Sequence, residues 1–118
     1  MSCQQASSRD ALNFSAGTLV KEYEVSQAVT RSKYDGKEIS VSGNAVNTPM
    51  ISVEFADQGS LLVEETESRP QRRVSCWFSK SQLEQFSKVR PGQFITVKGV
   101  FNGEAGVELK FCKLIKIE

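Results

Sequence analysis

The side chains best suited to bind a ligand gather in one short stretch, where basic and aromatic residues alternate with apolar ones. Arg72 and Arg73 adjoin a run in which Val74, Cys76 and Phe78 form one apolar set and Trp77 lies between its members. Neighbouring side chains of a strand point to opposite faces, so an inward apolar set predicts an outward Trp77. An outward tryptophan beside arginines can stack on a nucleobase while the guanidinium groups contact phosphate, each stacked base contributing about 1–3 kcal/mol. Two later residues on the outward parity of their strands extend this positive track: Lys98 and Lys110.

Trp77 and the arginines also have a structural interpretation. A helix predicted near the N-terminus must bury its apolar stripe, and Trp77 could pack beneath it as part of the core. Arg72 and Arg73 could then be solvated loop residues. The residues alone leave both interpretations open.

Catalytic chemistry has little support in the sequence. The chain contains no histidine, which excludes an imidazole general base, a Ser-His-Asp or Cys-His nucleophile and histidine-ligated zinc. Glu64, Glu65 and Glu67 could form a divalent-cation loop, but their spacing matches no EF-hand pattern, which favours a solvated acidic loop. No glycine-rich phosphate loop is present. We therefore expect a protein that is not an enzyme and that holds no metal or cofactor.

Charge is divided unevenly along the chain. The 118 residues include 15 Lys and Arg against 14 Asp and Glu, yet residues 1–68 carry net −5 and residues 69–118 carry net +6. Electrostatic attraction to an anionic ligand should therefore be local to the C-terminal half. The length predicts one domain, and no apolar run is long enough to cross a bilayer.

The first two-thirds of the chain predicts a polar tether, a helix and three strands. Residues 1–16 are rich in Ser, Gln and Ala and predict a flexible tether, so that the folded domain spans 17–118. Residues 18–31 predict one helix with Thr18 as its N-cap. Period-two alternation then predicts three strands, over residues 39–45 with a bend at Gly43, over 51–55 with an extension at 61–63, and over 74–78.

The remaining third predicts a short helix and two more strands. A capping-box spacing begins the helix at Ser81, and an alternating strand follows over 95–101. Asn102-Gly103 predicts a hairpin into a last strand with Phe111 on its inward set, whose alternation slips phase around Cys112. A helix between the third and fourth of five strands is the layout of the OB-fold, a mainly β Greek-key barrel. A five-stranded sandwich or an SH3-like barrel is the alternative.

Cys76 and Cys112 are too far apart in sequence, and too few, to indicate a zinc site. In the OB topology the third and fifth strands are neighbours, which could bring the two side chains within disulfide reach. A disulfide would stabilise the fold by about 2–4 kcal/mol and would indicate an oxidising compartment. The alternative is a pair of buried thiols that act as small hydrophobic residues.

Several short motifs together resemble the tRNA-anti-like family of OB-folds, which includes many bacterial proteins classed as lipoproteins. The resemblance covers residues 18–117. It implies an OB barrel and nucleic-acid binding, although fold analogy is a weak warrant for function. The motifs are Tyr34-Asp35-Gly36-Lys37, Ile39-Ser40-Val41-Ser42-Gly43, Val74-Ser75-Cys76-Trp77-Phe78, Pro91-Gly92-Gln93, Ile95-Thr96-Val97-Lys98-Gly99 and Leu109-Lys110-Phe111-Cys112.

Cys3 is followed by a polar run of Gln, Ala and Ser, and resembles the lipidated first residue of a mature bacterial lipoprotein. The chain shows no charged and apolar signal segment before it, so we expect the signal peptide to be absent from this sequence. A lipid on Cys3 would anchor the barrel to a membrane on the periplasmic side of the bacterial envelope. The alternative is an incidental free cysteine in a cytoplasmic protein.

The sequence thus predicts a non-enzymatic OB-fold binding module. Its expected ligand is single-stranded nucleic acid, held by Arg72, Arg73, Trp77, Lys98 and Lys110. The alternative is an envelope module that binds a protein or a glycan and no nucleic acid.

Overall fold

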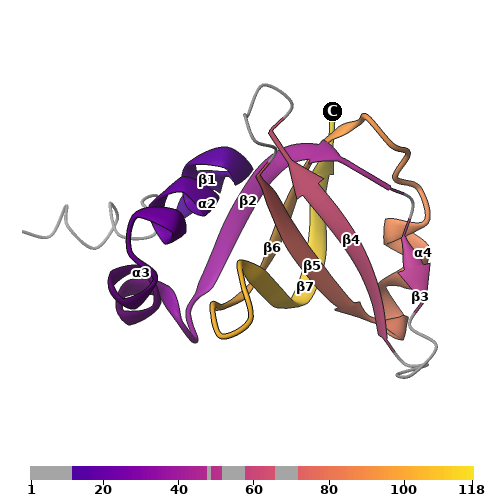
Figure 1. Cartoon of the computed structure of the whole chain (residues 1–118). Coiled ribbons are helices and arrows are strands. Elements are labelled where there is room, and N and C mark those ends of the chain that lie inside the picture. Colours follow the sequence, from indigo (N-terminus) through magenta and orange to yellow (C-terminus); the bar gives the residue numbers. More distant parts are fainter. Residues whose placement is uncertain (1–11, 48, 52–57, 66–71) are drawn as a thin grey trace, which may run out of the picture.

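The computed structural model describes residues 12–47, 49–51, 58–65 and 72–118. Two helices lie beside a strongly curved sheet, and a shorter helical segment lies at its opposite side (Figure 1). The elements, in chain order, are β1 (Asn13–Ser15), α2 (Ala16–Val25), α3 (Gln27–Tyr34), β2 (Glu38–Ala45), β3 (Met50–Ile51), β4 (Gln58–Glu64), β5 (Arg73–Ser79), the 3₁₀ helix η1 (Lys80–Gln82), α4 (Leu83–Phe86), β6 (Phe94–Asn102) and β7 (Glu108–Ile117).

Five strands close into a barrel in the order β2, β6, β7, β5, β4, and β4 pairs again with the end of β2. Alternating burial along β2, β4, β5 and β6 places one set of side chains inside the barrel, as the period-two pattern predicts. Gly43 allows β2 to bend against β4, because a Cβ there would lie 2.7 Å from the carbonyl oxygen of Glu64. With its helix inserted between β5 and β6, the barrel is the expected OB-fold.

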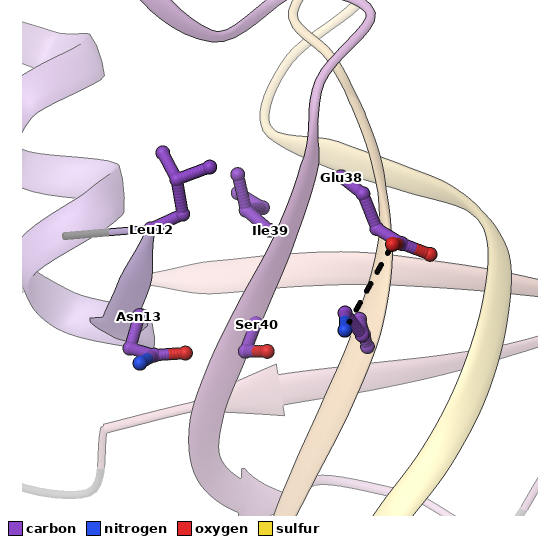
Figure 2. A pocket seen from close by; sticks show the side chains of 6 residues that line it. Leu12, Asn13, Glu38, Ile39 and Ser40 are labelled. Atoms are coloured by element: carbon purple, nitrogen blue, oxygen red, sulfur yellow. Dashed lines mark ion pairs between the residues drawn. The ribbon is translucent and has the colours of Figure 1, made fainter. Parts of the chain in front are cut away.

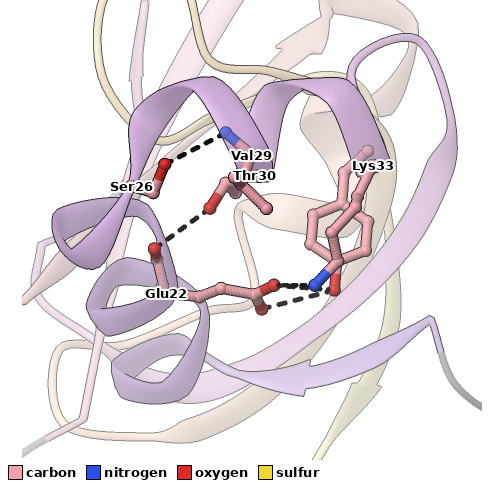
Figure 3. A network of polar contacts seen from close by, with 6 residues as sticks. Glu22, Ser26, Val29, Thr30 and Lys33 are labelled. Atoms are coloured by element: carbon pink, nitrogen blue, oxygen red, sulfur yellow. Dashed lines mark hydrogen bonds and ion pairs between the residues drawn. The ribbon is translucent and has the colours of Figure 1, made fainter.

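The helix predicted over residues 18–31 is two helices, because Ser26 interrupts it. Ser26 is extended, with φ −159°, and its hydroxyl accepts a hydrogen bond from the Val29 amide to begin α3 (Figure 3). Glu22 joins the two helices, since its carboxylate accepts hydrogen bonds from Lys33 and Tyr34. The N-cap of α2 is Ser15, whose hydroxyl accepts from the Thr18 amide, and Thr18 is not the cap.

Folded structure begins earlier than the expected boundary at residue 17. β1 pairs in parallel with β2, so that Phe14 lies opposite Val41. Residues 1–11 of the predicted tether, including Cys3, lie outside the described residues, as do residues 52–55 of the second predicted strand.

α2 and α4 close the barrel core. The Leu19 side chain of α2 is fully buried, and the Tyr23 hydroxyl donates a 2.7 Å hydrogen bond to the carbonyl oxygen of Gly103 in the β6–β7 connection. On α4, the Phe86 ring stacks on Phe78 of β5 with ring centroids 4.2 Å apart. The core therefore holds β5 in place from its inner face and leaves the outer face free to carry a site.

Candidate functional site

The strands β5 and β7 separate at a pocket on the barrel surface. They are registered in parallel at Ser75 opposite Glu108 and at Cys76 opposite Leu109. Beyond those pairs a pocket of about 290 Å³ lies between them. The residues that line the pocket are Gln58, Trp77, Phe78, Ser79, Lys110 and Phe111. We call it the β5–β7 pocket.

Trp77 lies half-buried on the outer face of β5, opposite Ser60 of β4. It is not among the side chains of the hydrophobic core or those packed against it, so the interpretation that it belongs to the core under the N-terminal helix is wrong. Lys110 places its ammonium nitrogen 6.0 Å from the centroid of the indole ring, at the outer limit of a cation–π contact. The indole nitrogen is buried and has no hydrogen-bond partner among the described residues.

Phe111 is 78% exposed, although its alternation predicted an inward side chain. The reason is a β-bulge: β6 advances by two residues, from Lys98 to Val100, while β7 changes by three, from Lys113 to Lys110. Phe111 takes a left-handed backbone with φ 55°, which is costly for a residue other than glycine. Strained backbone of this kind gathers at functional sites, and here it holds an exposed aromatic ring beside the β5–β7 pocket.

The two arginines predicted for the site lie away from the pocket. Arg72 forms a 3.1 Å ion pair with Glu24 of α2. Arg73 begins β5 and forms a 3.1 Å ion pair with Glu64 of β4. Arg73 is on the same outward parity as Trp77 but about 13 Å along the strand, at 3.3 Å per residue.

Lys98 points outward from β6 on a different part of the barrel. Its ammonium nitrogen forms an ion pair of 3.8 Å with the carboxylate of Glu38, which is the dashed line that ends at Glu38 in Figure 2. Of the five side chains predicted to bind nucleic acid, the structure brings only Trp77 and Lys110 together at one pocket.

Cys76 and Cys112 are buried neighbours, as the strand order predicts, but they are free thiols. The predicted disulfide is therefore not formed in the structure, which shows the alternative of two buried thiols. The Cys112 thiol donates a 3.5 Å hydrogen bond to the Leu109 carbonyl oxygen. Burial, together with the Cys112 neighbour, raises the pKa of the Cys76 thiol well above its ordinary value.

The acidic residues that could have formed a cation loop have structural partners. Glu65 accepts a 3.1 Å hydrogen bond from the Gly17 amide at the start of α2, and Glu64 pairs with Arg73. Glu67 lies outside the described residues. Across the part of the chain that the structure describes, no group of three or more Cys, Asp or Glu could hold a metal ion, and no helix has the length and apolarity to span a membrane.

Sequence reasoning missed Phe111 and Gln58 as pocket residues. The sequence signal for Phe111 was the phase slip of the last strand, because Ile115 and Ile117 continue the parity of Phe111 whereas Cys112 and Leu114 take the other. A break in alternation of this kind is typical of a β-bulge, which can turn a residue of the inward set outward. Gln58 follows a segment outside the described residues, and nothing in its sequence neighbourhood marks it.

Comparison with known proteins agrees with the fold. Residues 2–113 match the tRNA-anti-like family. A crystal structure of a "putative nucleic acid-binding lipoprotein" from Klebsiella pneumoniae superimposes with a TM-score of 0.76 at 16% identity, covering 88% of this chain and 91% of that one. OBody AM1L10 bound to hen egg-white lysozyme gives 0.56 at 19% identity, covering 73% and 83% of the two chains.

A small single-stranded DNA-binding protein from Streptomyces coelicolor gives a TM-score of 0.50 at 16% identity, covering 71% of this chain and 92% of that one. No curated protein sequence matches this chain significantly. At such identities the similar structures establish the fold alone.

Proposed function

The chain belongs to the tRNA-anti-like family, and we propose that it binds single-stranded nucleic acid at the β5–β7 pocket. OB barrels typically bind oligonucleotides over their second and third strands, which correspond here to β4 and β5. Trp77 on β5 and Phe111 on β7 provide the aromatic surfaces, and Lys110, which precedes Phe111 in sequence, lines the same pocket with its ammonium nitrogen 6.0 Å from the Trp77 ring centroid. Base stacking on such rings is tolerant of sequence, because every base has a π-face.

The observation that carries the proposal is the exposed, left-handed Phe111, which lines the same pocket as Trp77. A solvent-exposed phenylalanine gains nothing for the fold, and its backbone conformation costs stability. A ring that enters the pocket would contact Trp77 and Phe111, while Lys110 is close enough to meet the attached phosphate. Lys98 would contribute to the surrounding positive potential, whereas Arg72 and Arg73 would do so only by leaving Glu24 and Glu64.

The chain has a single tryptophan, so intrinsic fluorescence reports on Trp77 alone. We expect an oligothymidylate to quench this fluorescence at low salt, with an affinity that weakens steeply as salt rises. Trp77→Ala should abolish the signal and weaken binding of a fluorescein-labelled oligonucleotide, measured by anisotropy. Phe111→Ala should weaken anisotropy-detected binding about tenfold, within the 1–3 kcal/mol of one stacked base.

Val29→Ala is the matched control, because Val29 is an exposed apolar residue on α3, remote from the pocket. It should bind like the unmodified protein. Binding that is unaffected by both aromatic substitutions would reject the β5–β7 pocket as the site. No binding at low salt would reject nucleic acid as the ligand and favour a module that binds an envelope protein or glycan.

We also propose that the protein resides in the bacterial envelope through a lipid on Cys3. The sequence around Cys3 and the lipoprotein description of the similar Klebsiella structure support this location. Expression of the full-length gene with labelled fatty acid should label the protein, and Cys3→Ala should remain unlabelled. Equal absence of label from both would reject the anchor.

A further inference from the structure

Three lysines of β7 lie on one face of the barrel although they are spaced by three residues. On β6, Thr96, Lys98 and Val100 alternate in the usual way and point outward. Their partners across the β6–β7 ladder are Lys116, Lys113 and Lys110 in that order. We call these three partners the lysine row.

Two β-bulges make this row possible. A regular strand would turn Lys110 and Lys113 to opposite faces, since its side chains alternate. The ladder instead has two register shifts, and each adds one residue to β7 relative to β6. The extra positions fall at Phe111 and Ile115, which are 78% and 53% exposed. The outer edge of β7 therefore alternates cationic and apolar side chains.

The charges of the row are only weakly compensated by the protein. Lys113 lies directly opposite Lys98, and like charges in that position are destabilising. Lys113 has no acidic partner among the described residues. The acidic groups that face the remaining lysines are exposed or at long range: Glu38 lies 3.8 Å from Lys98, Glu108 lies 3.9 Å from Lys110 and Glu118 lies 3.2 Å from Lys116.

We propose that the lysine row, with Lys98, is the track for the phosphate backbone of the strand whose base enters the β5–β7 pocket. This inference rests on the proposed function and adds a direction to it, because the bound nucleic acid would run along β7 and away from β4. Successive lysines are two β6 residues apart, or about 7 Å, which is comparable to the separation of phosphates in an extended single strand.

The form of the row favours nucleic acid over a membrane surface. It is one strand wide and begins at Lys110, which also lines the β5–β7 pocket. A chain that alternates anionic phosphates with flat bases matches lysines interleaved with Phe111 and Ile115. A lipid surface would instead need a broad basic face, and Glu38 lies beside Lys98 on the flank of the row.

Lys113→Gln/Lys116→Gln tests the track, because neither residue lines the β5–β7 pocket. Binding of fluorescein-labelled oligothymidylate would be measured over a range of salt concentrations. Each lost phosphate contact lowers the slope of log K against log salt by about 0.7 for a single strand, so the double variant should lose about 1.4. Trp77 quenching at saturation should remain unchanged, because the base still reaches the pocket.

Lys21→Gln/Lys88→Gln is the control of equal net charge, because both residues are exposed, Lys21 on α2 and Lys88 in the turn after α4. It should keep the slope of the unmodified protein. A double variant of the row that binds with an unchanged slope would overturn the track and leave the proposed function intact. No oligonucleotide binding by the unmodified protein would overturn both. Row-dependent binding to phosphatidylglycerol vesicles without oligonucleotide binding would assign the row to a membrane surface and overturn the track.

Discussion

The sulfur atoms of Cys76 and Cys112 lie 2.9 Å apart, and both side chains are buried. Cys76 immediately precedes Trp77 on β5, and Cys112 immediately follows Phe111 on β7. Each thiol is thus on the residue next to one of the two aromatic residues that line the β5–β7 pocket. Any covalent link between the two sulfurs would join the strands that carry its aromatic residues.

We predict that oxidised glutathione converts the two thiols into an intramolecular disulfide, with two glutathione thiols as the reduced product. Intact mass should fall by two hydrogens, and the free energy of unfolding should rise by about 2–4 kcal/mol. Cys112→Ala, which cannot form the bond, is the control. Two alkylatable thiols after oxidation would contradict the prediction.

The free energy of unfolding of the reduced protein should fall as the pH rises past the ordinary pKa of a thiol. Because the pKa of Cys76 is raised in the folded state, the unfolded chain loses this proton first as the pH rises. The contribution of the Cys76 thiol to stability is therefore complete below the ordinary thiol pKa, and it is lost as the pH rises from there through the raised pKa of the folded state. Urea unfolding on either side of that pKa, compared with Cys76→Ala, measures the effect.

Phe111→Gly should stabilise the protein and weaken ligand binding at once. A left-handed φ costs a side-chain-bearing residue about 1–2 kcal/mol, and the greater freedom of unfolded glycine offsets about half of the gain. We expect up to about 1 kcal/mol of added stability in urea unfolding. Phe111→Ala separates the two effects, because it removes the ring and keeps the strain. Equal stability of the two variants would contradict the strain argument.

Gly99→Ala should destabilise the barrel at the bulge. A Cβ on Gly99 would lie 2.8 Å from both the Cys112 sulfur and the Lys110 carbonyl oxygen. Neither can retreat easily, since one is buried and the other is backbone, so overpacking of about 1–3 kcal/mol is expected. Gly99→Ala/Cys112→Ala should recover only part of the loss. Lys98→Ala, on the exposed neighbour, controls for substitution in β6, and an unchanged urea midpoint for Gly99→Ala would argue against the close contact.

Alternation was sufficient to predict most of the barrel. β2, β5 and β6 each bury every second residue, so Val41, Cys76 and Val97 could be placed inside from sequence. Ser26 was harder to interpret, because a serine within a helical stretch can either remain helical or cap a new helix. In the structure the backbone of Ser26 is extended, so Ser26 caps a new helix. This outcome depends on how α2 and α3 pack, which the local sequence does not show.

Phe111 shows where local pattern fails. Its place in the alternation predicted burial, but Cys112 takes the inward position and β7 gains a residue relative to β6. That outcome depends on Gly99, a residue of the partner strand that leaves room for the Cys112 sulfur. Similarly, the neighbouring arginines seemed to accompany Trp77, whereas Arg72 pairs with Glu24 of α2 and Arg73 pairs with Glu64 on the adjacent strand β4.

The short ladder between β5 and β7 also bears on how the barrel opens. Among the described residues these strands are registered at two positions, whereas β4 and β5 are registered at seven. Local opening follows the weakly supported parts of a fold, so hydrogen exchange should be faster along this junction than along the β4–β5 ladder. A ligand that contacts Trp77 on β5 and Lys110 on β7 would hold the junction closed. Binding should therefore slow the hydrogen exchange of backbone amides on both strands.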